Sequence, residues 1–160
     1  MENNAATIIY TDIQILEKCR KLEEIAADMY HFLARAHTSD PQISALWEKT
    51  AREEENHASQ FSLAIRMKKG LSVEIKAEKM KVEEALKIAK SIAEGMKKDP
   101  PRIRKALEDV IMLEEIFSEF HLANTMYFPD ESHKKLFQAM MSADKDHVGS
   151  LKTALSNLRG

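Results

Sequence analysis

The chain has 160 residues, of which 44% are hydrophobic and 31% charged, with four glycines and four prolines. This length suits one domain with a sizeable core, and the scarcity of glycine and proline favours long helices over turns and short strands. The formal net charge of -2 excludes the strongly basic surface that nucleic acids or anionic membranes require.

Cysteine usage and the first residues indicate the cellular setting. The single cysteine, Cys19, excludes an internal disulfide and a CxxC motif, which favours a reducing compartment. The opening residues MENNAATIIY lack the basic start and long apolar core of a signal peptide. No run reaches the roughly 20 apolar residues of a membrane span. We therefore expect a cytoplasmic protein that binds neither membrane nor nucleic acid.

Turn-forming residues divide the chain into five predicted helices. Thr11 and Gln14 are spaced as a capping box, so the first helix is expected to begin at residue 7 or 11. Ser39 or Asp40 can cap the second helix, with Pro41 in its first turn. No segment predicts a strand. The predicted helices cover about 7–37, 41–70, 72–98, 101–127 and 131–158.

Loop lengths arrange these helices as two hairpins. The links after residues 37 and 127 are short, which forces the flanking helices to be antiparallel neighbours. The stretch from Leu71 to Asp99 is long enough to carry the chain from one end of a bundle to the other. The sequence therefore predicts an all-α, antiparallel four-helix bundle over residues 1–160, with an extra helix in a long crossover.

The two hairpins also resemble one another. EEIAADMYHFLA from residue 23 matches EEIFSEFHLA from residue 114, and LWEKTAREEENH from residue 46 matches LFQAMMSADKDH from residue 136. The spacing from Glu23 to His57 differs by one residue from that between Glu114 and His147. A duplicated hairpin predicts a site built twice about a pseudo-twofold axis. Shared helical composition is the alternative explanation.

Helical phase places an acid on the apolar stripe of each main helix. Glu23 lies on the stripe of the first helix, and Glu114 lies on that of the fourth. The second and fifth helices each place an acid and a histidine one turn apart on the same face. These two pairs are Glu54 with His57 and Asp144 with His147.

Four buried carboxylates would be strongly destabilising unless they were protonated or met by positive charge. The apolar stripes hold no lysine or arginine that could form internal salt bridges. Two divalent cations would balance four carboxylates, and two neutral imidazoles would complete the coordination without adding charge. The sequence therefore predicts a two-metal centre, with a set of ordinary buried polar side chains as the alternative.

This arrangement, one acid from each of two helices and an acid-x-x-histidine pair from each of the others, is found in ferritin-like dimetal bundles. The motifs EEIAADMY and EENHA, with Tyr30 seven residues after Glu23 and a helical crossover, most resemble the diiron domain of rubrerythrins. The resemblance covers nearly the whole chain. It implies two iron ions, although manganese or zinc would also bind such ligands.

The resemblance also implies a role for each ligand. Glu23 and Glu114 would be terminal ligands, His57 and His147 would each bind one iron, and Glu54 and Asp144 would bridge or chelate. Asp144 stands where the family usually has glutamate. Phe117 replaces a further glutamate that rubrerythrins use in a peroxide-linked ligand switch. The resemblance therefore supports the metal site more firmly than the peroxidase reaction.

Tyr30 and four histidines lie outside this predicted ligand set. Tyr30 either hydrogen-bonds a ligand carboxylate or is an ordinary core tyrosine. His121 occupies the equivalent place in the second hairpin and could do the same or bind metal. His31, His37 and His133 are expected on the surface.

The resemblance implies that the diferrous form reduces hydrogen peroxide or oxygen by two electrons. These residues include no four-cysteine rubredoxin module, so we expect electrons from a separate protein such as a rubredoxin. One alternative is oxidation of ferrous iron for storage or detoxification. Another is a metal-free helical scaffold that binds partners. A homodimer is expected by analogy with other ferritin-like bundles.

Overall fold

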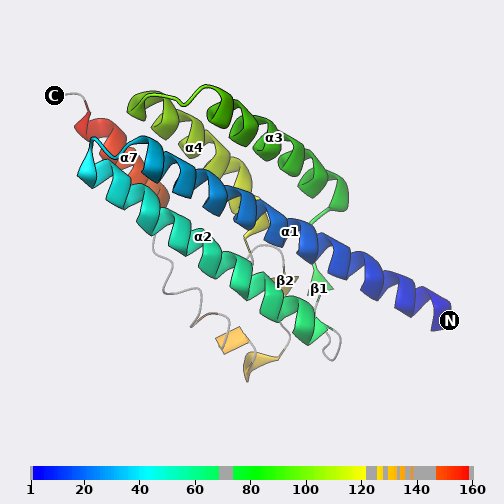
Figure 1. Ribbon diagram of the computed structural model, residues 1–160. Helices are drawn as coiled ribbons and strands as arrows, with labels where there is room; N and C mark the ends of the chain where they lie inside the picture. The colour runs from blue at the N-terminus through cyan, green and yellow to red at the C-terminus, as the bar shows by residue number, and fades with distance from the viewer. Residues whose placement is uncertain are drawn as a thin grey trace.

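Two antiparallel helices are the longest elements that the structure describes. The computed structural model describes residues 2–68, 74–121, 126–127, 130–132, 134–135, 138 and 147–158. Helices α1 (Glu2–Ala36) and α2 (Pro41–Lys68) lie side by side along most of the length of α2 (Figure 1). The crossover helix α3 (Lys79–Lys98) packs on α1, and α4 (Ile103–Phe117) packs on α7 (His147–Asn157). These helices form the all-α, ferritin-like bundle that the sequence predicts.

The turn between α1 and α2 follows its predicted capping chemistry. The Ile43 backbone N–H donates to Asp40 Oδ1 at 3.1 Å, and Pro41 is the first helical residue. The Ser44 hydroxyl donates to the Ala34 carbonyl at 2.8 Å, which ties the start of α2 to the end of α1. Asp40 is therefore the cap, because its side chain satisfies an N–H that the helix leaves without an internal acceptor.

The core is a continuous set of apolar side chains from α1, α2, α3, α4, η1 and α7. Each large aliphatic or aromatic side chain removed from water stabilises the fold by about 1.5–3 kcal/mol. The core also surrounds the few buried polar groups, so these groups lie in a medium of low polarity. Its members include Leu16, Cys19, Leu33, Trp47, Phe61, Val82, Leu107, Leu113 and Leu151.

The first helix begins earlier than predicted. α1 starts at Glu2, so Thr11 lies inside the helix and the predicted capping box with Gln14 is wrong. Residues 2–10 contain neither glycine nor proline. Since nothing in this stretch interrupts a helix, the backbone continues through the sequence that could have capped it.

The fourth helix ends earlier than predicted, and a small sheet follows it. α4 stops at Phe117, passes into one 3-10 turn (η1, Ser118–Phe120), and the backbone becomes extended at His121. Strand β2 (Met126–Tyr127) then pairs antiparallel with β1 (Glu74–Ile75). The predictions of a helix up to residue 127 and of no strand are therefore wrong. Each strand contains one residue of a type that favours extended backbone, the β-branched Ile75 in β1 and the aromatic Tyr127 in β2.

Strand β1 also shortens the crossover helix, which begins at Lys79 and not near residue 72. Its predicted end is confirmed, since α3 finishes at Lys98. Of the predicted helix over 131–158, the structure describes short helical pieces and α7. Gly70, the predicted stop of the second helix, lies outside the described residues.

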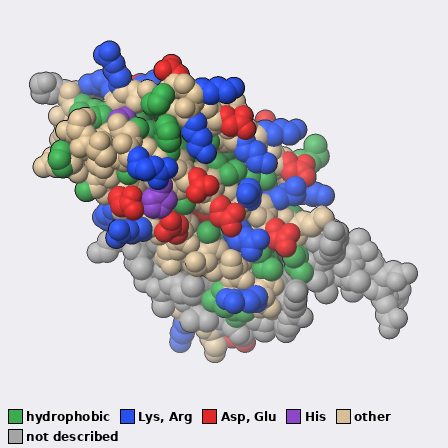
Figure 2. All heavy atoms as spheres, viewed as in Figure 1, with side chains coloured by type: hydrophobic (Ala, Val, Ile, Leu, Met, Phe, Trp, Pro, Cys, Tyr) green, Lys and Arg blue, Asp and Glu red, His purple; other side chains and the backbone are tan. Residues whose placement is uncertain are grey.

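The surface shown in Figure 2 carries acidic and basic side chains interspersed over the helices. Elsewhere along α2, ion pairs one turn apart join Lys49 with Glu53 and Arg52 with Glu48. Within the part of the chain that the structure describes, no helix combines the length and apolar character needed to cross a membrane.

Candidate metal centre

Three carboxylates from three different helices are buried in the bundle. Glu23 of α1 is 3% exposed, Glu54 of α2 is 0% exposed, and Glu114 of α4 is 1% exposed. Each lies on the inner face of its helix, where helical phase predicts it. The predicted burial of these three acids is therefore confirmed.

His57 connects two of these acids. Its Nδ1 atom lies 3.3 Å from Glu23 Oε2 and 3.6 Å from Glu54 Oε2. Burial would lower the pKa of His57, but hydrogen bonds to the two carboxylates and their charges outweigh burial and raise it to about 11. In the metal-free protein the imidazole is therefore protonated at neutral pH, and Nδ1–H donates to Glu23.

Burial acts on Glu54 in the opposite direction to its action on His57. Burial raises the pKa of this carboxyl from 4.5 to about 7, and the neighbouring charge of Glu23 adds to the rise. His57 opposes the rise without cancelling it. Glu54 therefore holds a proton in a pH range where an exposed glutamate would be ionised, and a cation placed beside it would displace that proton.

Tyr30 holds the third acid. Its hydroxyl donates to Glu114 Oε1 at 2.5 Å, so the hydrogen bond predicted as one of its two roles is confirmed. Burial and the charge of Glu114 raise the pKa of Tyr30 well above its ordinary value. The phenol therefore keeps its proton and acts as a fixed donor to one side of the carboxylate.

Trp47, which is hydrogen-bonded to His37, packs against the Tyr30 ring. The Tyr30 ring stacks on Trp47 with 5.8 Å between ring centroids. Trp47 Nε1–H donates to His37 Nδ1 at 2.9 Å, and His37 Nε2–H donates to the Pro101 carbonyl at 2.8 Å. His37 is therefore buried with both ring nitrogens hydrogen-bonded, and its predicted surface position is wrong. A buried tryptophan needs an acceptor for its N–H. This requirement of Trp47 was the feature of the sequence that could have predicted a buried His37.

The charges of this cluster do not balance. No lysine or arginine is buried among the side chains that the structure describes. With all groups ionised, Glu23, Glu54 and Glu114 carry three negative charges against one positive charge on His57. Such an excess in a low-polarity core is unfavourable unless protons or metal ions compensate it. Carboxylate oxygens and imidazole nitrogens are donors that iron, manganese and zinc accept, so the donor set fits a divalent metal.

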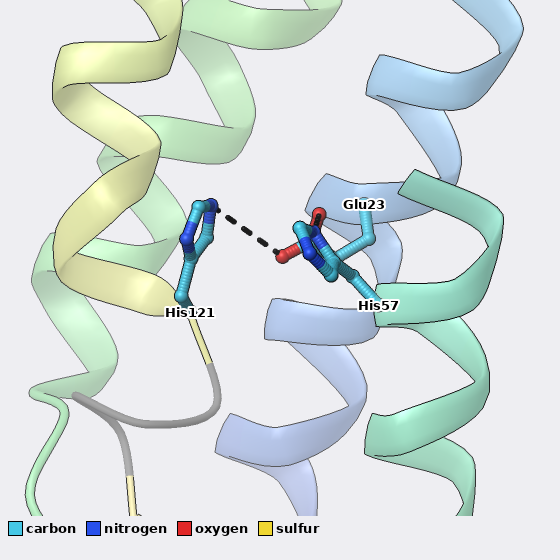
Figure 3. A group of neighbouring side chains, drawn as sticks. All are labelled: Glu23, His57 and His121. Carbon is cyan, nitrogen blue, oxygen red and sulfur yellow. Dashed lines mark hydrogen bonds and ion pairs between the residues drawn. The ribbon is translucent and has the colours of Figure 1, made fainter. Parts of the chain in front are cut away.

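A histidine from the second half of the chain completes a candidate metal-binding group. The side chains of Glu23, His57 and His121 point toward one another from α1, α2 and the end of η1 (Figure 3). One ligand atom from each lies within 4.8 Å of the others. The distance between His121 Nε2 and Glu23 Oε1, which lie in different halves of the chain, is 4.0 Å. His121 was not in the predicted ligand set, although its position equivalent to Tyr30 indicated a role near the site.

The remaining predicted ligands belong to the fifth predicted helix. Asp144 lies outside the described residues, and so does the side chain of His147, whose backbone begins α7. Phe117, which stands in place of a further family glutamate, is buried in the apolar core. The described site therefore contains four of the six predicted ligands, Glu23, Glu54, His57 and Glu114, together with His121.

A helical bundle of ferritin-like fold that buries carboxylates and imidazoles from separate helices defines a class of candidate metal-binding proteins. The chain belongs to the rubrerythrin family, because the Rubrerythrin family model matches residues 14–155. This range contains every predicted ligand. Searches of curated proteins and of solved structures gave no match.

Proposed function

We propose that this protein is a dimetal carboxylate protein with redox activity. Glu23, Glu54, His57 and Glu114 would hold the metals, and Asp144 and His147 would complete the set. The observation that carries the proposal is the burial of three acids from three helices, with no buried lysine or arginine among the described side chains. Divalent cations neutralise such a cluster, whereas protons alone would leave ionisable groups confined in an apolar core.

Iron is the metal that the family and the oxygen- and nitrogen-rich ligands favour, with manganese or zinc as other occupants. Two ferrous ions held there would supply two electrons, which with two protons reduce hydrogen peroxide to water or oxygen to hydrogen peroxide. Electrons would return from a separate donor protein such as a rubredoxin. We place this activity in the cytoplasm and expect a homodimer.

The chain's own residues would prepare the site in three ways. His57 would release its Nδ1 proton to become a neutral ligand, since a protonated imidazole has no lone pair for a metal. Tyr30 would hold Glu114 in one orientation through its hydroxyl. The apolar side chains around the cluster, among them Trp47 and Phe61, would exclude water, which strengthens electrostatic interactions at the centre.

Metal loading tests the proposal directly. Anaerobic addition of Fe²⁺ or Mn²⁺ should raise the melting temperature, because the metal binds only the folded state. The double variant Glu54→Ala with His57→Ala should lose this rise. A matched control changes the half-exposed Glu24 and the partly buried His31, which lie outside the cluster, and should keep the rise (Glu24→Ala with His31→Ala). An unchanged rise in the first variant would contradict the ligand assignment.

The reaction is tested on the reduced, loaded protein. One equivalent of hydrogen peroxide per dimetal centre should oxidise it, and reductant should restore it for further cycles. Continued oxidation of added Fe²⁺ with iron retained would instead indicate the ferroxidase activity of the first alternative. Protein that purifies without metal and shows no thermal response would indicate a helical scaffold.

A further inference from the structure

The group formed by Glu23, His57 and His121 differs in composition from the rest of the buried cluster. It supplies one carboxylate and two imidazoles, while Glu54 and Glu114 supply carboxylates alone. Two histidines and one carboxylate on one side of a metal are the ligands of many mononuclear non-haem iron sites, which leave further positions open. This composition is a reason to consider the group as a site in its own right.

The fold brings His121 to this place through the early end of α4. The helix tightens into the 3-10 turn at Ser118, and the backbone at His121 is extended with φ −65° and ψ 151°. Phe117 and Phe120 are buried on either side of the change. The turn is therefore anchored by apolar side chains, and its exit residue faces the α1–α2 pair.

The side chains need only small movements to bind one ion. Ligand atoms about 2.1 Å from a metal lie roughly 3 Å from one another when they are neighbours in its coordination shell. His57 Nδ1 and Glu23 Oε2 are already 3.3 Å apart. The rings of His57 and His121 have centroids 5.1 Å apart at an interplanar angle of 49°. His121 is only partly buried, so its ring can rotate to close the remaining gap.

We propose that Glu23, His57 and His121 bind one ferrous ion as a two-histidine, one-carboxylate site, and that this position fills without Asp144 or His147. The inference rests on the proposed metal-binding function for Glu23 and His57, and it adds His121 as a ligand. It also makes the centre asymmetric. One metal position takes its protein ligands from α1, α2 and the end of η1, and the other depends on Asp144 and His147.

His121 could instead be a positioning residue that hydrogen-bonds the Glu23 carboxylate. The two roles respond differently to His121→Gln, because glutamine keeps a hydrogen-bond donor but is a weak metal ligand. A ligand role predicts a large loss of metal affinity, whereas a positioning role predicts little change.

Anaerobic titration with Co²⁺, a coloured and paramagnetic substitute for ferrous iron, can count the sites and their histidines. The background variant is Asp144→Ala with His147→Ala, which lacks the two ligands predicted in the fifth helix. We expect it to bind one Co²⁺ per chain, with a ligand-field absorption band and two paramagnetically shifted imidazole N–H signals in its NMR spectrum. Adding His121→Gln should weaken binding by more than about 100-fold, which exceeds the roughly 10–100-fold cost of losing an outer-shell partner, and should remove one of these signals. Adding His31→Ala should change neither.

Each outcome bears on one claim. If the background variant binds no Co²⁺, or if His121→Gln leaves its affinity and both signals unchanged, the inference is overturned. If the wild type binds a single Co²⁺ that is lost with His121→Gln, the two-metal function fails while the inference stands. Circular dichroism of the metal-free variants verifies that the helices remain folded.

Discussion

Replacing Glu54 by glutamine should reveal the energetic strain that the metal relieves. The substitution keeps the shape of the side chain but removes its ionisation. In the folded, metal-free protein Glu54 keeps its proton up to about pH 7, while the unfolded chain loses it near pH 4.5. The folded state therefore binds more protons in this window, and wild-type stability falls as the pH rises through it.

The size of the effect follows from these two values. Each pKa unit between the folded and unfolded states is worth roughly 1.4 kcal/mol. Between about pH 5 and pH 8, the wild type should therefore lose roughly 2 to 3 kcal/mol that Glu54→Gln does not lose. A buried amide has its own cost, which is the same at both pH values and cancels in the comparison.

Urea unfolding in the presence of a chelator measures this difference. The free energy of unfolding of Glu54→Gln should rise relative to that of the wild type by roughly 2 to 3 kcal/mol from pH 5 to pH 8. The variant should also lose metal-induced stabilisation. Glu24→Gln is the matched control, since Glu24 is half-exposed on the outer side of α1 and should show a difference below about 0.5 kcal/mol. A pH-independent difference for Glu54→Gln would refute the reasoning, because it would mean that Glu54 ionises normally in the folded protein.

Three further predictions follow from other contacts. Tyr30→Phe removes the hydroxyl that donates to Glu114 and should destabilise the metal-free protein by about 1.5–3 kcal/mol in urea; a loss below about 0.5 kcal/mol would contradict this. The hydrogen bond to Glu55 raises the pKa of His31, so this protonated bridge should stabilise the fold by roughly 0.2–1 kcal/mol below pH 6.5 and lose its effect as the pH rises through the raised value. His31→Gln should therefore cost stability at pH 5.5 and almost none at pH 9 in the same assay, and an equal cost at both would argue against it. Metal binding near neutral pH should release at least one proton per chain, because the His57 imidazole has a pKa of about 11; calorimetry in buffers of different ionisation enthalpy would contradict this by finding no release.

Much of the fold could be predicted because its signals are local and repeated along the helices. The apolar stripes identified the inward faces of α1, α2 and α4, and the same phase placed Glu23, Glu54 and Glu114 inside. Asp40 and Pro41 marked the start of α2 because a cap and a first-turn proline act through the adjacent backbone.

Two of the errors, the missed strand pair and the surface position of His37, concern features that depend on distant parts of the chain. The β1–β2 pair joins residues about fifty positions apart, and each strand has only two residues, too few for a period-2 pattern. His37 was placed on the surface because its acceptor at Pro101 and its donor, Trp47, lie on other segments. His121 was left undecided because the end of α4, which directs its side chain, was predicted too late.

The most direct test of the central claim is a crystal structure of anaerobically iron-loaded protein with anomalous diffraction measured at the iron absorption edge. The account predicts anomalous peaks about 2.0–2.2 Å from the inward carboxylate and imidazole atoms of Glu23, Glu54, His57 and Glu114. Iron peaks only at surface positions, or a centre in which these acids are held by protons alone after loading, would contradict it.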